Sequence, residues 1–336
     1  MILGWDSFFW RWTEDFGVHW YGLAYLCSFV LGALVIRFIS RRQDSGLSDE
    51  QCWDLILFAA VAIAIGGRLG FCFFYDHDLF FQFRGEFPFW GVLALQQGGM
   101  SAFGAMLAIA ALLLFLSWRW GISLPHLFDL SAVTGALTFF FLRLASFLSG
   151  ELLGRPVDGD FPYACKFPQE IFYWLQAGGS NEPHLQALAK VEPSLNLAAP
   201  DLGEQILLLV SQGNTKLAEA LTAQLAWRYP TQIFAAAGEG FLIFLLLMVL
   251  WYSPRRPGVI AGLFFLFYSL SRFVEEVYAA PEWTGGPWIL GLTIGQVLAG
   301  ILFVAGCWFL FFYGRRDLIP RPGWGLGPNV RIHRRP

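Results

Sequence analysis

Seven long apolar segments constrain the fold of this chain more than any other feature of its sequence. They lie near residues 18–38, 53–75, 98–118, 127–148, 231–252, 258–278 and 292–313. About 20 apolar residues in a helix cross the hydrocarbon core of a bilayer, which is roughly 30 Å thick. Only 14% of the residues are charged, whereas soluble domains have about a quarter. The sequence therefore predicts an all-α integral membrane protein with seven transmembrane helices.

Arginines at the ends of these segments predict how the chain is oriented. Connections rich in Lys and Arg stay on the cytoplasmic side of a membrane. Every second connection here carries arginines, and so does the C-terminal tail. We therefore expect an outer N-terminus and a cytoplasmic C-terminus. The arginines concerned are Arg37, Arg41, Arg42, Arg119, Arg255, Arg256, Arg315, Arg316, Arg321, Arg331, Arg334 and Arg335.

One polar insertion divides the membrane part in two. Residues 1–148 hold the first four predicted helices and residues 231–313 hold the last three, with the insertion at 149–230 between them. The start of the insertion is rich in Gly and Pro, whereas its later part has apolar residues at helical spacing. By the predicted orientation it forms a small periplasmic helical head domain. Residues 314–336 form a basic cytoplasmic tail.

The five cysteines are scattered, and most lie in or beside the apolar segments. The sequence contains no CxxC and no HxxxH spacing, which redox and zinc sites commonly use. We therefore expect no metal site. Nothing in the charge pattern indicates a nucleic-acid partner.

Three arginines lie inside apolar segments, where a charge is costly. An Arg at the centre of a membrane helix costs about 2.5–3.5 kcal/mol, so such residues usually face cavities or pair with other groups. Each of the three lies on a segment that is predicted to run from the cytoplasm to the outside, and each lies in the outer half of its segment. They are Arg68, Arg143 and Arg272. The nearby carboxylates are those of Glu151, Glu239, Glu275 and Glu276.

These arginines allow two interpretations. In the first, each is neutralised in a structural salt bridge, as Arg272 would be by Glu276 one helical turn later. In the second, they bind the phosphate of a lipid, because a guanidinium is always charged and grips phosphate oxygens in pairs. Glycines at 66–70, 98–105 and 149–154 allow either close helix packing or the approach of a headgroup to the backbone.

Short motifs also occur in a fixed order along the chain. They are HWYG (19–22), GGRLG with FFYD (66–76), GGMS (98–101), RLxxFxxGELxGR (143–155), PTQ (230–232) and GxxxGLFxxxYxxxR (258–272) followed by Glu276. In these motifs the chain resembles the bacterial prolipoprotein diacylglyceryl transferases over nearly its whole length. That family has seven helices, an outer N-terminus and a periplasmic head domain, and it implies a multi-pass protein of the bacterial cytoplasmic (inner) membrane.

The resemblance implies a reaction. Members of the family transfer the diacylglyceryl group of phosphatidylglycerol to the thiol of the lipobox cysteine in the signal peptide of a preprolipoprotein. A thioether forms and glycerol phosphate is released, in the first step of lipoprotein maturation. The implied partners are phosphatidylglycerol and the preprolipoprotein, and no cofactor is implied.

The motifs also imply which residues do this. Arg143 and Arg272 would clamp the phosphate of the donor lipid, and Arg68 and Glu151 would orient or balance them. Candidates for the base that takes the thiol proton are Glu276, His19 and the lipid's own phosphate. The residues implied to bind lipid or phosphate are Arg68, Arg143, Arg272, His19, Tyr21, Gly98, Gly99, Ser146, Gly154 and Arg155.

The chain departs from the family pattern at several polar positions. A histidine that follows GGMS in the family, and is a candidate general base, is replaced by Phe103, which cannot take a proton. Two asparagines are replaced by Ser146 and Ser149. Tyr229, Phe234, Ala235 and Ala279 stand where the family has histidine, tyrosine, glutamate and arginine.

Two functions remain open at this point. The chain is either an active transferase or a catalytically degenerate paralogue that binds phospholipid or a membrane-protein partner as a structural component. The helical part of the insertion, at 175–228, suits the docking of such a partner, and it equally suits a lid over the acceptor site. A transporter fits less well, because no pair of helices broken by Gly or Pro is evident.

Overall fold

The structure of the protein is a computed structural model that describes residues 8–12, 17–43, 46–83, 85, 89–94, 99–157, 161–178, 183–280, 290–315 and 319–325. Six of its helical stretches are long and apolar enough to cross a membrane. They are Trp20–Gln43 (α1), Asp49–Phe74 (α2), Phe103–Trp120 within α3 (Ala102–Trp120), Leu124–Ser149 (α4), Thr231–Leu250 and Ile294–Arg315 (α13). All six coincide with segments predicted from the sequence.

The remaining predicted segment coincides with helix α11, Val259–Tyr278. This helix has 20 residues, which is enough to cross a bilayer, but its last two turns carry Arg272, Glu275 and Glu276. Within the described ranges, length and composition therefore mark six spans, whereas the sequence predicted seven.

The chain divides into two compact units. The first unit comprises Met1–Ser28, Gly135–Leu246 and Leu263–Trp308, and the second comprises Phe29–Thr134, Leu247–Gly262 and Phe309–Pro336. Each unit is described by itself below.

The first unit opens with a short antiparallel pair of strands, β1 (Phe8–Arg11) and β2 (Gly17–His19). Helix α1 begins directly after it at Trp20. His19 therefore ends a strand, and the first predicted segment becomes helical two residues later than expected.

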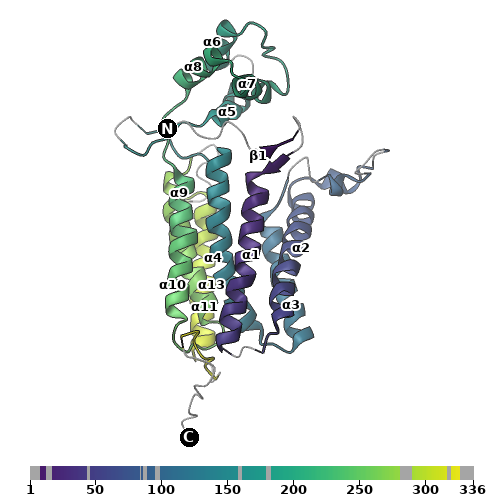
Figure 1. Ribbon diagram of the computed structural model, residues 1–336, viewed down its shortest axis with the longest axis vertical. Coiled ribbons are helices and arrows are strands. Elements are labelled where there is room, and N and C mark those ends of the chain that lie inside the picture. Colours follow the sequence, from purple (N-terminus) through teal and green to yellow (C-terminus); the bar gives the residue numbers. More distant parts are fainter. Residues whose placement is uncertain are drawn as a thin grey trace. The chain divides into compact units, whose positions relative to one another are not determined.

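Four short helices form a separate group within the first unit. They are α5 (Ile171–Gly178), α6 (Pro183–Val191), α7 (Leu202–Ser211) and α8 (Thr215–Gln224), and they follow a 3-10 turn, η4 (Pro168–Glu170). Figure 1 shows the four helices gathered together. Leucines and isoleucines three or four residues apart point into one small core, in which Leu185, Leu188, Leu202, Ile206, Leu217 and Leu221 are fully buried. This spacing is what packs amphipathic helices against each other.

The 231–250 stretch is not a uniform α-helix. It consists of α9 (Thr231–Ala235), a π-helix (Ala236–Leu242) and α10 (Ile243–Leu250). In the π-helix, a Cβ on Gly240 would lie 2.4 Å from the Cα of Phe140, so only glycine allows this close approach to α4. The same π-helix carries Glu239, which is fully buried.

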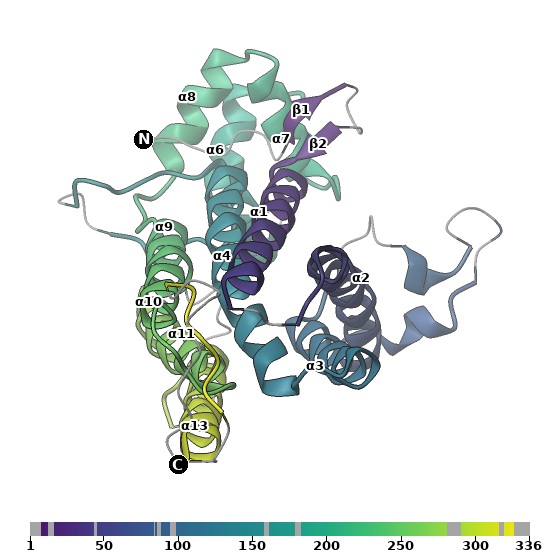
Figure 2. The same cartoon turned by 60° about the horizontal axis from the view of Figure 1, so that its bottom comes forward.

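In the second unit, α2 and α3 lie side by side (Figure 2). Glycines make the contact: a Cβ on Gly104 would lie 2.3 Å from the carbonyl oxygen of Gly66, and one on Gly70 would lie 2.6 Å from the Cα of Gly104. Small residues let membrane helices approach closely in this way.

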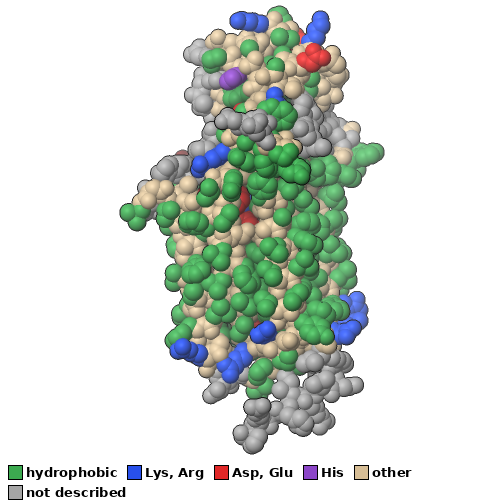
Figure 3. Space-filling view, turned by 90° about the vertical axis from the view of Figure 1, so that its left-hand side faces the viewer, with side chains coloured by type: hydrophobic (Ala, Val, Ile, Leu, Met, Phe, Trp, Pro, Cys, Tyr) green, Lys and Arg blue, Asp and Glu red, His purple; other side chains and the backbone are tan. Residues whose placement is uncertain are grey.

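Large hydrophobic side chains are exposed along the long helices. Leu57, Val249 and Val304 are 60%, 68% and 67% exposed, and hydrophobic side chains cover much of the face drawn in Figure 3. Such a surface is stable against lipid and unstable against water.

Candidate active site

Two arginines and three glutamates meet inside the first unit, and we call this group the charge cluster. Arg143 of α4 donates from Nε and Nη2 to Glu239 Oε2, at 3.0 and 2.8 Å. Arg272 of α11 pairs with Glu275 on its own helix and with Glu276, where Nη2 lies 2.7 Å from Oε2. Longer contacts of 3.7 and 3.8 Å join Arg143 to Glu275 and Arg272 to Glu239.

The charge cluster is largely shielded from solvent. The side chains of Glu239, Glu276 and Glu275 are 0%, 2% and 7% exposed, and those of Arg143 and Arg272 are 12% and 26% exposed. Ions taken out of water need partners of opposite charge, and breaking one such pair costs about 3–5 kcal/mol. When all five groups are ionised, two positive and three negative charges leave a net charge of −1.

Glu276 has a second support outside the cluster. Thr293 Oγ1 donates to its Oε1 at 2.9 Å. A Cβ on Gly295 would lie 2.4 Å from the same oxygen, so glycine at this position leaves room for the carboxylate. Thr293 directly precedes α13, and Gly295 lies in the first turn of that helix.

A small cavity of about 70 Å³ opens beside the cluster. The cavity is lined by four charged side chains and three apolar ones, namely Arg143, Arg272, Glu275, Glu276, Leu152, Leu153 and Ala279.

The loop that follows α4 forms one wall of this cavity. Leu152 adopts a left-handed backbone conformation with φ of 55°, which is strained for a residue other than glycine. Hydrogen bonds hold the loop in this form: Thr231 Oγ1 donates to the Leu152 carbonyl at 3.2 Å, and the Ala280 amide donates to the Leu153 carbonyl at 3.0 Å. The wall is therefore fixed by chain segments far away in the sequence.

A second polar network lies next to this loop. Tyr21 of α1 donates its hydroxyl proton to Glu151 Oε2 at 2.8 Å and also lies 2.8 Å from Ser146 Oγ. Glu151 is half-buried. Burial raises the pKa of Glu151, while the hydrogen bond from Tyr21 and the charge of His19 lower it. Since burial is the largest effect, Glu151 is a better proton acceptor than an exposed glutamate.

The structure therefore brings most of the predicted residues of the first unit into two adjoining groups. Arg143, Arg272 and Glu276 lie in the charge cluster. Tyr21, Ser146 and Glu151 form the network, and Glu151 directly precedes the cavity residue Leu152.

Other predicted residues of the first unit lie differently. His19 and Arg155 are exposed, and Arg155 donates to the carbonyl of Ala279 at 3.1 Å. Gly154 is buried against backbone, since a Cβ there would lie 2.2 Å from the carbonyl oxygen of Tyr229. Gly154 thus shapes the loop by permitting close packing.

Arg68 and Gly99 belong to the second unit. Arg68 is 4% exposed and donates to the backbone carbonyls of Val92, Gly91, Ala94 and Gly99 at 2.8–3.1 Å. These bonds fasten the chain that leads into α3. Gly99 has a φ of 85° and packs against the ring of Phe71, while Gly98 lies outside the described residues.

Phe103 also lies in the second unit, at the start of α3. Its ring is 48% exposed and meets the ring of Phe74 edge-on, with 5.4 Å between the centroids. The position of the family histidine thus carries an aromatic side chain in an aromatic contact.

Glu239 and Glu275 are functional candidates that the sequence indicated only as nearby carboxylates. Glu275 lies three residues after Arg272, a spacing that pairs side chains on a helix. Glu239 is 96 residues from Arg143, and it faces that arginine from a π-helix, which apolar spacing does not reveal.

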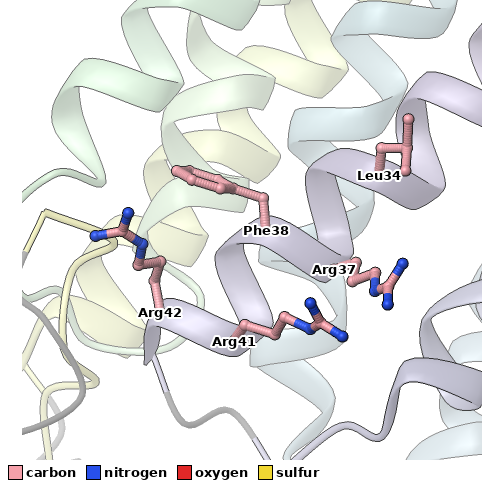
Figure 4. A pocket seen from close by; sticks show the side chains of 5 residues that line it. All are labelled: Leu34, Arg37, Phe38, Arg41 and Arg42. Atoms are coloured by element: carbon pink, nitrogen blue, oxygen red, sulfur yellow. The ribbon is translucent and has the colours of Figure 1, made fainter.

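A larger hollow, of about 290 Å³, lies in the second unit at the end of α1 and is lined by Leu34, Arg37, Phe38, Arg41 and Arg42. Figure 4 shows Arg37 and Arg41 turned to one side of the helix and Phe38 and Arg42 to the other. Arg37 and Arg41 both pair with Asp49, and Arg42 lies over the Phe38 ring at 5.5 Å. These local contacts account for the arginines at this helix end.

Comparison with known proteins identifies the family. A family model described as prolipoprotein diacylglyceryl transferase matches residues 8–312. A Bdellovibrio bacteriovorus protein named phosphatidylglycerol–prolipoprotein diacylglyceryl transferase is 38% identical over 354 aligned residues, which cover all of both chains. Proteins of that name from Rhodospirillum rubrum and Rhodospirillum centenum are 32% and 30% identical; they cover 90% and 87% of this chain and 89% and 86% of their own. This multi-pass membrane protein therefore belongs to the prolipoprotein diacylglyceryl transferase family.

Proposed function

We propose that the protein transfers the diacylglyceryl group of phosphatidylglycerol to the lipobox cysteine of preprolipoproteins, in the bacterial inner membrane. The observation that carries the proposal is the approach of Arg143 and Arg272, from two different helices, to one cavity. Two guanidinium groups at one small cavity suit a phosphate. Relatives that match the whole chain or most of it are named for this reaction.

In the proposed reaction, the cysteine thiolate attacks the glyceryl carbon that bears the phosphate. A carbon–sulfur bond forms as the carbon–oxygen bond breaks, and the departing glycerol phosphate keeps the electron pair. Negative charge therefore grows on the phosphate oxygens, where Arg143 and Arg272 stabilise it. Removing one donor of this kind from an active site typically slows the reaction about 10²- to 10³-fold.

For the proton acceptor we propose Glu151, with Tyr21 as its hydrogen-bonding partner. The thiol must lose its proton because only the thiolate is a good nucleophile. Phe103 cannot accept that proton. Glu276 is already held by Arg272 and Thr293, whereas the Glu151 carboxylate accepts a hydrogen bond from the neutral hydroxyl of Tyr21, and its pKa is raised by burial.

We also propose that α11 is the seventh transmembrane helix, with the N-terminus outside and the cytoplasm on the side of the C-terminus. The charges of α11 are paired within the first unit, Arg272 with Glu275 and Glu276, and pairing lowers their cost in a membrane. On this orientation, α5 to α8 form a periplasmic head.

The proposal is tested by incubating the purified protein with phosphatidylglycerol vesicles and a lipobox peptide. Mass spectrometry should find the peptide heavier by one diacylglyceryl group, and glycerol phosphate released in equal amount. A peptide with serine in place of cysteine is the control, and it should stay unmodified.

The same assay separates the transferase from a degenerate paralogue. A degenerate paralogue would bind the lipid but leave the peptide unmodified, and transfer would appear only in the Phe103→His variant. That outcome would refute the proposed activity and favour a binding role, with a partner at 175–228.

A further inference from the structure

The carboxylate of Glu275 lies between the two arginines of the charge cluster. Its Oε2 contacts Arg272 Nη1 and lies 3.7 Å from Arg143 Nη2. The side chain is 7% exposed and lines the cavity. An oxygen that contacts two guanidinium groups has the surroundings that a bound phosphate oxygen requires.

The other two glutamates of the cluster are held more firmly. Glu239 accepts two hydrogen bonds from Arg143 and is completely buried on the π-helix. Glu276 has Thr293 as a partner in addition to Arg272. Glu275 contacts the two arginines and the carboxylate of Glu239. Glu275 therefore competes most directly for the groups that a phosphate would bind.

The charge of the cluster opposes the entry of an anion. With all five groups ionised its net charge is −1, and a phosphodiester would add a further negative charge to a largely buried site. Like charges in such a site repel strongly, and two neighbouring carboxylates commonly hold one proton between them. Protonation of one carboxylate as the phosphate enters would keep the site from becoming more negative.

We propose that Glu275 is a built-in competitor for the lipid phosphate, which sets the affinity for the donor lipid and couples its capture to the uptake of one proton. The proposal rests on the proposed function, because the competing ligand is the phosphodiester of phosphatidylglycerol. On capture, phosphate oxygens replace Glu275 Oε2 at both arginines, and the released carboxylate takes a proton from solvent.

The groups that face Glu275 fit this exchange. From α4 comes Arg143, from the π-helix comes Glu239, and from α11 itself come Arg272, Glu276 and Tyr268. While no lipid is bound, the two cations attract the carboxylate of Glu275. Once a phosphate engages these cations, the neighbouring carboxylates favour its protonated form.

The position of Glu275 in the cavity wall leads to the same conclusion. Its side chain lines the cavity together with Arg143 and Arg272. Moving the Glu275 side chain out of the space between Arg143 and Arg272 enlarges the cavity at the place where the phosphate would bind.

The test measures phosphatidylglycerol binding to the full-length protein in lipid nanodiscs, from pH 6 to pH 8. The wild type is compared with Glu275→Gln, which is isosteric but uncharged, and with Glu204→Gln, a matched change at an exposed residue of α7. If one proton is taken up, the wild-type affinity should fall with rising pH, approaching tenfold per pH unit. Glu275→Gln should bind about tenfold or more tightly at pH 8 and show little pH dependence, while Glu204→Gln follows the wild type.

Equal or weaker binding by Glu275→Gln, with the pH dependence unchanged, would overturn the proposal. If Glu275→Gln does not fold, Glu275→Asp takes its place, because its shorter carboxylate reaches the arginines less well. Tighter lipid binding by Glu275→Asp, with the pH dependence kept, supports competition. Unchanged or weaker lipid binding by this variant overturns the proposal. Arg143→Ala separates this proposal from the proposed function. If Arg143→Ala still binds the lipid, the lipid site itself is refuted. If Arg143→Ala loses binding while Glu275→Gln binds the lipid as the wild type does, only the role of Glu275 is refuted.

Discussion

At the scale of single residues, Arg143 depends on the carboxylate of Glu239. Its side chain is 12% exposed, and Glu239 accepts hydrogen bonds from two of its guanidinium nitrogens. The next carboxylate, Glu275, is 3.7 Å away. Removing one member of a buried ion pair leaves the other without compensation, which costs far more than the pair contributes to stability.

Glu239→Ala should therefore lower the free energy of unfolding by about 3–5 kcal/mol, measured as a loss of thermal stability in detergent. Glu239→Gln keeps an acceptor for Arg143 and should lose less. The matched control is Glu204→Gln, which lies at the surface of α7 and should behave as the wild type. Equal stability of Glu239→Ala and the control would contradict the role given to this pair.

Glu151 gives a prediction about pH. Its pKa is raised from 4.5 by burial, and only the ionised carboxylate can accept a proton. The rate of transfer should therefore rise with pH through a pKa that lies above 4.5. Glu151→Gln should remove this acidic limb and lower the plateau rate about 10²- to 10⁴-fold, measured as initial rates on a lipobox peptide. A variant that keeps both the limb and the plateau would exclude Glu151 as the base.

At the scale of elements, the contact between α2 and α3 relies on the absence of side chains. A Cβ on Gly104 would lie 2.3 Å from the Gly66 carbonyl oxygen, so a methyl group there must push the two helices apart. Overpacking of this kind costs about 1–3 kcal/mol. In α13, by contrast, nothing lies within 4 Å of a Cβ on Gly300.

Gly104→Ala should accordingly destabilise the protein by about 1–3 kcal/mol, whereas Gly300→Ala should be neutral or slightly stabilising because alanine favours the helix. Thermal unfolding of the two variants in the same detergent checks this. The account of the helix contact fails if Gly104→Ala is as stable as Gly300→Ala.

Helix positions could be predicted from the sequence better than helix ends. Helix α2 begins at Asp49, four residues before the predicted segment, because Ser48 and Gln51 form a capping box. Helix α3 begins after 98 because Ser101 caps it. Both serines could have been recognised as caps. The π-helix around Glu239 could not, because a π-turn leaves no separate signature in apolar spacing.

The candidate site was predictable only in part, for a similar reason. The motif at 143–155 singled out Arg143, Ser146 and Glu151 through family resemblance. The partners of Arg143 depend on how α4, the π-helix and α11 pack inside the first unit, and one sequence does not contain that information.

At the scale of the whole molecule, the arginines at the segment ends make a prediction about orientation. A reporter fused after Arg42 should report the cytoplasm, and a reporter inserted near Lys190 in α6 should report the periplasm. Alkaline phosphatase and a fluorescent protein give opposite signals on the two sides. The same signal at both sites would refute the predicted topology.

The measurement that tests the account most directly is the rate of diacylglyceryl transfer by the purified wild type, Arg143→Ala and the control Arg42→Ala. Arg42 is exposed at the end of α1 and lies over Phe38, so its loss should leave the rate unchanged. Loss of Arg143 should slow transfer about 10²- to 10³-fold with the protein still folded. Transfer at the wild-type rate by folded Arg143→Ala would contradict the claim that the charge cluster holds the lipid phosphate.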